Sequence, residues 1–109
     1  MLRSHTCGEL RIENINQNIQ LSGWVQKSRD LGGMTFVDIR DRYGITQVVF
    51  NMETNADLCR QARKLGREFV ISGKGTVAER SNKNSKMATG EVEIIAEDLE
   101  ILNKAKLPP

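Results

Sequence analysis

The sequence predicts an all-β fold: a five-stranded Greek-key barrel with one α-helix between the third and fourth strands. Three observations lead to this prediction. Apolar and polar residues alternate with a period of two in several segments, as they do in strands with one buried face. Short glycine-containing turns separate the first three of these segments. One segment between the third and the fourth has helical spacing instead.

The first three strands are expected to form a meander with short connections. The alternating pattern marks strands at 19–26, 34–40 and 45–50. A Gly-Gly pair between the first two strands is typical of a hairpin turn, and residues 41–44 supply the turn before the third strand.

Residues 54–66 are predicted to form a helix. Thr54 or Asn55 can supply the N-cap, and Gly66 lies where a C-cap glycine is common. The apolar residues of this segment recur at i, i+4 and i+7, which are Leu58, Ala62 and Leu65.

A fourth strand is expected at 69–77, where Gly73 and Gly75 suit a sharply bent barrel strand. After a polar loop, a fifth strand opens at Glu91 and runs to about Leu102. This order of elements is that of the OB-fold, a barrel that binds single-stranded nucleic acid on one face.

The length and composition agree with a single domain of this kind. The chain has 109 residues, of which 39% are apolar, and this is enough to form a core without disulfides or a metal. We expect the OB-fold domain to cover 1–105 and a linker to begin at 106–109, because two terminal prolines cannot continue a strand.

The charge and the cysteines exclude other classes. The net charge of +2 is too small for a protein that binds nucleic acid by bulk charge, although residues 60–86 hold eight basic and two acidic residues, which gives a local +6. This block is either a phosphate-binding surface or a solvated helix face. No apolar run approaches the roughly 20 residues of a membrane helix and no secretory signal is visible. We therefore expect a cytoplasmic protein with Cys7 and Cys59 as free thiols.

The second strand places an aromatic residue on its outer face. Thr35, Val37 and Ile39 share the uncharged face, so Phe36 points the other way, among charged residues. A base-stacking platform would explain this position; cover by a loop or by the N-terminal segment would explain it equally well.

Three polar residues are further candidates for contacts to nucleic acid. Gln47, in the middle of the third strand, has an amide that can read a base edge, Arg29 lies at the first hairpin, and Glu91 opens the fifth strand. Taken alone, Gln47 and Arg29 are more simply explained as ordinary exposed side chains, and Glu91 could repel phosphate instead of binding a base. Nothing indicates catalysis or a metal site, because the single histidine is next to the N-terminus and no phosphate-binding glycine motif is present.

Several linked strings resemble a known family. They are LSGWV at 21–25, RDLGG at 29–33, FVDIRDRYGITQVVF at 36–50 and MATGEVE at 87–93. Together with HTCGEL at 5–10, they resemble the N-terminal anticodon-binding domain of bacterial aspartyl-tRNA synthetases over nearly the whole chain.

The resemblance implies a role for each candidate residue in binding the anticodon loop of tRNA-Asp. Phe36 would stack on the central uridine and Gln47 would hydrogen-bond that base. Arg29 would contact the loop and Glu91 would face the first anticodon base. Arg80 would contribute from the variable loop.

The resemblance also implies what lies outside this chain. The family continues into a class II catalytic domain that activates aspartate with ATP and Mg²⁺, and the whole enzyme is expected to be a homodimer. The chain itself is expected to be a non-catalytic monomer that binds tRNA without charging it and needs no cofactor.

Two alternatives are a stand-alone OB-fold protein that binds single-stranded nucleic acid and a structural OB-fold domain that binds protein partners.

Overall fold

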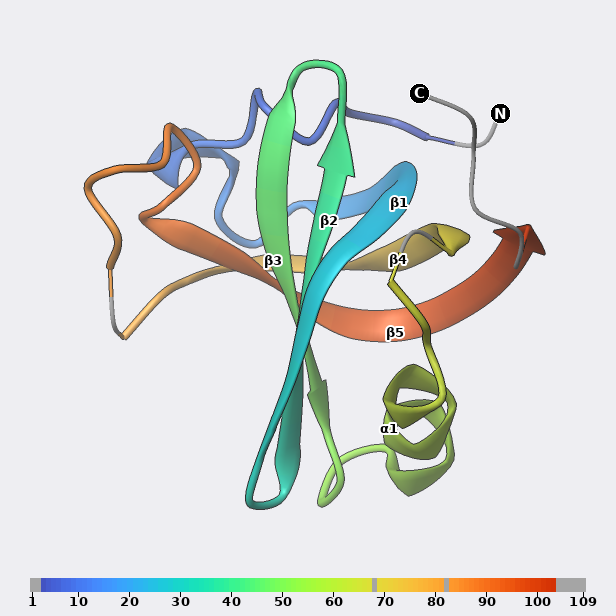
Figure 1. Cartoon of the computed structure of the whole chain (residues 1–109). Coiled ribbons are helices and arrows are strands. Elements are labelled where there is room, and N and C mark those ends of the chain that lie inside the picture. Colours follow the sequence, from blue (N-terminus) through green and yellow to red (C-terminus); the bar gives the residue numbers. More distant parts are fainter. Residues whose placement is uncertain (1–2, 68, 82, 104–109) are drawn as a thin grey trace.

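The computed structural model describes residues 3–67, 69–81 and 83–103 and confirms the predicted fold (Figure 1). A short 3₁₀ helix, η1, covers Ile12–Asn14. The barrel strands are β1 (Asn18–Leu31), β2 (Met34–Asp41), β3 (Gly44–Asn51), β4 (Val70–Glu79) and β5 (Val92–Asn103), and helix α1 (Ala56–Arg63) lies between β3 and β4. The linker predicted at 106–109 lies outside the described residues.

The five strands close into a barrel in the order β1-β2-β3-β5-β4. Neighbouring strands are antiparallel except β3 and β5, which are parallel. The β1–β2 hairpin turns at Gly32, whose φ of 60° favours glycine. At the β2–β3 turn, Oδ1 of Asp41 accepts hydrogen bonds from the backbone amides of Tyr43 and Gly44 at 2.8 and 3.1 Å.

The core fills the barrel interior with one apolar row from each strand. Thr35, Val37 and Ile39 are all fully buried, which confirms the predicted inner face of β2. Helix α1 packs against β2, β3 and β5 and contributes Leu58 and Ala62 to the core. Leu65, the third residue of the predicted apolar face, is buried in the same core just after the helix ends.

The two ends of α1 differ in how well the sequence predicted them. Asn55 is the N-cap, because its side chain accepts a hydrogen bond from the amide of Leu58 at 3.1 Å. The prediction of Gly66 as the C-cap is wrong. The helix ends at Arg63, and its C-cap Lys64 keeps a right-handed backbone with its amide bonded to Gln61 O. Gly66 instead lies against Phe69: a Cβ at position 66 would lie 2.7 Å from the Phe69 ring, so a larger residue there would require the ring to move.

Strand β4 bends where its pairing with β5 shifts register, between Lys74 and Gly75. A Cβ on Gly75 would lie 2.2 Å from the carbonyl oxygen of Ile95. This close approach agrees with the prediction that glycine serves a sharply bent strand.

The N-terminal segment is fixed to the β2–β3 turn by buried hydrogen bonds. The amide of Cys7 donates to Oδ2 of Asp41 at 2.9 Å, and the Thr46 hydroxyl donates to the carbonyl of Cys7 at 2.6 Å. Both cysteines are free, as predicted, and both are buried. Burial and the neighbouring Asp41 raise the pKa of the Cys7 thiol, so this thiol stays protonated.

The basic block at 60–86 does not form one surface. It is divided between α1, β4 and the β4–β5 loop, and the helix and that loop lie on different sides of the barrel (Figure 1). Three of its cations are ion-paired: Arg60 with Asp57, Arg63 with Asp30 and Lys83 with Glu79. Within the described ranges, none of the helices has the length and apolar character needed to cross a membrane.

Candidate nucleic-acid interface

The strand register arranges the outer face of the barrel in rows that run across β1, β2 and β3. Directly paired residues of antiparallel strands lie on the same face. One row contains Arg29, Phe36 and Val49, because Arg29 pairs with Phe36 and Phe36 pairs with Val49. The next row contains Lys27, Asp38 and Gln47, and the third contains Trp24, Arg40 and Ile45.

Polar contacts link three of the predicted residues directly. The Arg29 guanidinium lies over the Phe36 ring, 5.6 Å from its centroid. Its Nη2 also donates to Oε1 of Gln47 at 3.1 Å. The Nε2 of Gln47 in turn donates to Oε1 of Glu93 at 3.0 Å. The structure therefore brings Arg29, Phe36 and Gln47 together and adds Glu93 to them.

Gln47 is not the ordinary exposed side chain that remained one reading of the sequence. It is only 4% exposed, and both ends of its amide are engaged. Because Arg29 is a donor and a carboxylate is an acceptor, the amide can satisfy both only in one orientation. One N–H and one lone pair remain for a ligand.

Phe36 is half-buried on the outer face. Its row partner Val49 is 1% exposed but lies outside the main core cluster. Val49 is therefore a buried residue on the Phe36 side of the sheet, outside the main core. The Arg29 guanidinium covers part of the half-buried Phe36 ring.

Arg80 follows β4 and joins the same region through its charge. Burial raises the pKa of both Asp38 and Glu93, and the positive charge of Arg80 opposes that rise in each of them. The Nε of Arg80 is buried, and no described residue accepts a hydrogen bond from it. An unsatisfied buried donor is costly, so this atom is a point where the described contacts leave a hydrogen bond unmade.

Two half-buried carboxyl groups give this face its unusual electrostatics. Burial raises the pKa of Asp38, and the charges of Arg29, Arg80 and Lys27 oppose that rise. Burial also raises the pKa of Glu93, against the hydrogen bond from Gln47 and the charge of Arg80.

Glu91 does not take part in this network. Its side chain is exposed, and its carbonyl accepts a hydrogen bond from the Arg80 amide at 3.0 Å as strand β5 begins one residue later than predicted. The sequence alone did not single out Glu93, which the structure places against Gln47. The available signal was its spacing of two from Glu91, which places both on one face.

The residues that the structure describes contain no group of three or more His, Cys, Asp or Glu side chains that could hold a metal ion. The outer face offers an aromatic ring, a fixed amide, carboxylates and guanidinium groups. These are groups that stack on bases, read base edges and bind phosphates.

Comparisons with known proteins agree with this chemistry. The family model for the OB-fold nucleic acid binding domain of the tRNA anticodon type matches residues 19–102. An aspartate–tRNA ligase of Bacteroides fragilis is 64% identical over 109 residues, which is 100% of this chain and 19% of that protein. The corresponding ligase of Bacteroides thetaiotaomicron is 63% identical with the same coverage. The chain thus spans about a fifth of the length of these relatives.

Solved structures show the same fold. The asparaginyl-tRNA synthetase of Pyrococcus horikoshii in complex with asparaginyl-adenylate superposes with a TM-score of 0.80 and 28% identity, over 97% of this chain and 24% of that one. An OBody bound to hen egg-white lysozyme gives a TM-score of 0.83 and 26% identity, over 94% and 95% of the two chains. The chain therefore belongs to the tRNA anticodon-binding family of OB-fold nucleic acid binding domains, in the form found in bacterial aspartate–tRNA ligases.

Proposed function

We propose that this chain recognises the anticodon loop of tRNA-Asp. The observation that carries the proposal is the linked group of Arg29, Phe36, Gln47 and Glu93 on the outer face of the barrel. It combines a stacking surface with an amide of fixed direction, which is what base recognition requires. The aspartate–tRNA ligases that match the whole chain support this choice of RNA.

Phe36 and Gln47 share the central base in this proposal. A uridine stacks on the Phe36 ring in the place that the Arg29 guanidinium takes in the free protein. Uridine offers a carbonyl acceptor and an N3–H donor, and the one free N–H and one free lone pair of Gln47 match both. Cytidine reverses this pattern, and the hydrogen bond from Nε2 of Gln47 to the Glu93 carboxylate opposes a flip of the amide that would follow it, because the flip would turn the amide oxygen towards the carboxylate.

Residues around Phe36 and Gln47 contact the bases next to the central one. Glu91 remains the proposed contact for the first anticodon base, where a carboxylate accepts from the donor edge of guanine. Glu93 lies on the same face beside Gln47 and supplies a second carboxylate for an adjacent base. Arg80, with its unpaired Nε, contacts a phosphate or a base acceptor.

The reaction of the complete ligase lies outside this chain in our proposal. We assign aspartate activation with ATP and Mg²⁺, and the contacts of a homodimer, to the part of the relatives that this chain does not span. We place the protein in the cytoplasm and expect the isolated chain to be a monomer without aspartate-dependent pyrophosphate exchange.

A titration tests the proposal directly. The 109-residue chain is titrated with four nucleic acids: the anticodon stem–loop of tRNA-Asp, the same stem–loop with a cytidine-centred loop, a stem–loop with a scrambled loop, and poly-dT. We expect the uridine-centred loop to bind at least about tenfold more tightly than the other three, since one base-edge contact is worth about 1–3 kcal/mol. Equal binding of all four would identify a general single-strand-binding protein instead, and binding of none would leave a structural OB-fold domain.

A further inference from the structure

A series of three hollows runs along one side of the barrel next to the Gln47 region. The first, of about 590 Å³, is lined by residues that include Lys27, Asp38 and Arg67. The second, of about 290 Å³, shares Gln26 and Arg67 with it and adds Arg40. The third, of about 330 Å³, shares Arg40 with the second. The hollows therefore adjoin one another through shared side chains.

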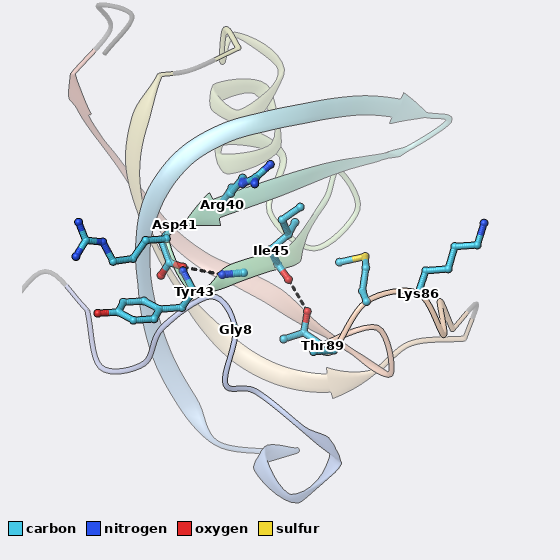
Figure 2. A pocket seen from close by; sticks show the side chains of 11 residues that line it. Gly8, Arg40, Asp41, Tyr43, Ile45, Lys86 and Thr89 are labelled. Atoms are coloured by element: carbon cyan, nitrogen blue, oxygen red, sulfur yellow. Dashed lines mark hydrogen bonds between the residues drawn. The ribbon is translucent and has the colours of Figure 1, made fainter. Parts of the chain in front are cut away.

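The third hollow lies at the β2–β3 turn and the β4–β5 loop. Figure 2 shows its lining, with Arg40 on β2, Tyr43 in the turn, and Lys86 and Thr89 on the β4–β5 loop. The Thr89 hydroxyl donates to the carbonyl of Ile45 and so fixes the loop to β3. Arg42 also lines this hollow.

Five cations line these hollows, and all five side chains are exposed. They are Lys27, Arg40, Arg42, Arg67 and Lys86, which we call the Arg40 track. None of the five forms an ion pair with a carboxylate of the described residues.

Two acidic residues also line the hollows, and neither cancels the track. Asp41 is almost fully buried, accepts hydrogen bonds from three backbone amides and is paired with Arg3 at 3.7 Å. Asp38 is half-buried and lies between Lys27 and Gln47 in their row. The solvent-facing charge of the track is therefore positive.

The position of Arg40 relates the track to the base-binding residues. Phe36, Asp38 and Arg40 follow one another on the outer face of β2, at intervals of about 7 Å for two strand residues. The rows of the outer face therefore lead from Phe36, past Gln47, to Arg40. A register shift in β1 between Val25 and Lys27 leaves Gln26 as a bulge, and Oε1 of Gln26 accepts a hydrogen bond from Arg40 at 2.9 Å. The guanidinium is thus held where the hollows meet.

We propose that the Arg40 track binds the sugar–phosphate backbone of the RNA beyond the bases read at Gln47, on the strand that continues into the anticodon stem. This inference rests on the proposed function for the identity of the RNA. Exposed, unpaired cations along a shallow surface bind phosphates without reading sequence. Half-buried Trp24 pairs with Arg40 across β1 and β2 and lines the second hollow, which gives the track one aromatic surface as well.

The test compares two double variants of the 109-residue chain. Arg40→Gln/Arg67→Gln removes two charges from the track. Arg60→Gln/Lys83→Gln removes two charges that are already paired, with Asp57 and Glu79, and is the matched control. Arg40→Lys/Arg67→Lys keeps the charge and shows whether a loss comes from charge or from folding. Each protein is titrated with uridine- and cytidine-centred stem–loops and with the loop nucleotides alone, over a series of salt concentrations.

We expect the track variant to bind the stem–loop about tenfold more weakly and to lower the slope of log K against log salt by about two, one for each lost phosphate contact. Its preference for uridine should be unchanged, its loss on the loop nucleotides alone should be smaller, and the lysine variant should restore binding. Equal losses in the track and control variants would overturn the track. If the wild type binds without preferring uridine while the track variant still loses affinity, the proposed function fails and the track remains. If the wild type binds no RNA, both fail.

Discussion

Arg29 donates a hydrogen bond to the amide oxygen of Gln47 over 3.1 Å, although the two residues lie on strands that are not neighbours in the barrel. The same guanidinium lies over Phe36, on the strand between them. One side chain thus occupies the stacking surface and sets the direction of the reading amide. Arrival of a base on Phe36 must therefore also change the surroundings of Gln47.

Gln47→Ala should reduce the choice of central base. We expect uridine-centred stem–loops to lose about 1–3 kcal/mol of binding free energy, the size of one base-edge contact, and the preference over cytidine to decrease with it. Isothermal titration of both proteins with both loops measures this. Gln20→Ala is the control, because Gln20 is a β1 glutamine bonded to Ser72 on another part of the barrel. An equal loss on both loops would mean that another residue chooses the base.

Phe36→Ala should weaken binding more than it weakens the fold. The lost stacking should cost about 1–3 kcal/mol in RNA binding, and the half-buried ring should cost about 1 kcal/mol in unfolding free energy. Val37→Ala, at a fully buried neighbour, should show the opposite pattern, with about 1–3 kcal/mol lost from stability. Urea unfolding and RNA titration of both variants separate the two effects. A Phe36 variant that unfolds but binds normally per folded molecule would contradict the stacking role.

Glu93→Gln should stabilise the domain at neutral pH. The folded state raises the pKa of Glu93, chiefly by burial, so the folded state binds this proton more tightly than the unfolded state. Stability contributed by this group therefore falls as pH rises from the unfolded pKa through the folded one. The glutamine oxygen keeps the acceptor for Gln47 without the charge. Urea unfolding is measured from about pH 4, near the ordinary pKa of a carboxyl group, to about pH 7. The unfolding free energy of the variant should increase relative to that of the wild type as pH rises. A constant difference across that range would contradict the burial argument.

Gly75→Ala should destabilise the barrel by at least ~2 kcal/mol, because its Cβ would overlap a backbone oxygen that cannot move without opening the sheet. Gly73→Ala is the matched control two residues earlier in β4. Its nearest contact is the Cδ1 of Ile39 at 3.6 Å, so its effect should stay within about 1 kcal/mol. Thermal unfolding followed by circular dichroism compares the two, and similar melting temperatures would show that the bend does not depend on glycine at 75.

The sequence predicted the features that depend on local periodicity. Alternation identified the inner face of β2 and the five strands, and helical spacing identified α1, because burial on one face imposes those periods. The ends of elements were less well predicted. Glycine is the residue most often expected at a helix C-cap, but Gly66 lies beyond the helix end and packs against the Phe69 ring. Helix-end patterns do not contain this packing relationship.

In the candidate site, too, the sequence predicted what one strand shows by itself and did not predict what depends on contacts between strands. Phe36 was found because an aromatic residue on a charged face violates the pattern of its own strand. The burial of Gln47 and the involvement of Glu93 could not be read from either strand alone, since their contact depends on the pairing of β3 with β5 over a separation of 46 residues. The same holds for the basic residues: the block that is dense in sequence is dispersed in space, whereas the Arg40 track collects cations from β1, β2, two turns and a loop.

The parallel pairing of β3 with β5 has a further consequence. It consists of two residue pairs, Val48 with Ile94 and Val49 with Ile95, whereas β1 and β2 share seven. This seam is the shortest closure of the barrel, and Gln47 and Glu93 extend it by one row through their side chains. A nucleotide held by both would bridge the seam, and binding to the closed form alone raises the free energy of opening it. The bound anticodon would then help to hold β3 and β5 together, beside their two backbone pairs. Amide hydrogen exchange along β3 and β5 should therefore slow when RNA is bound.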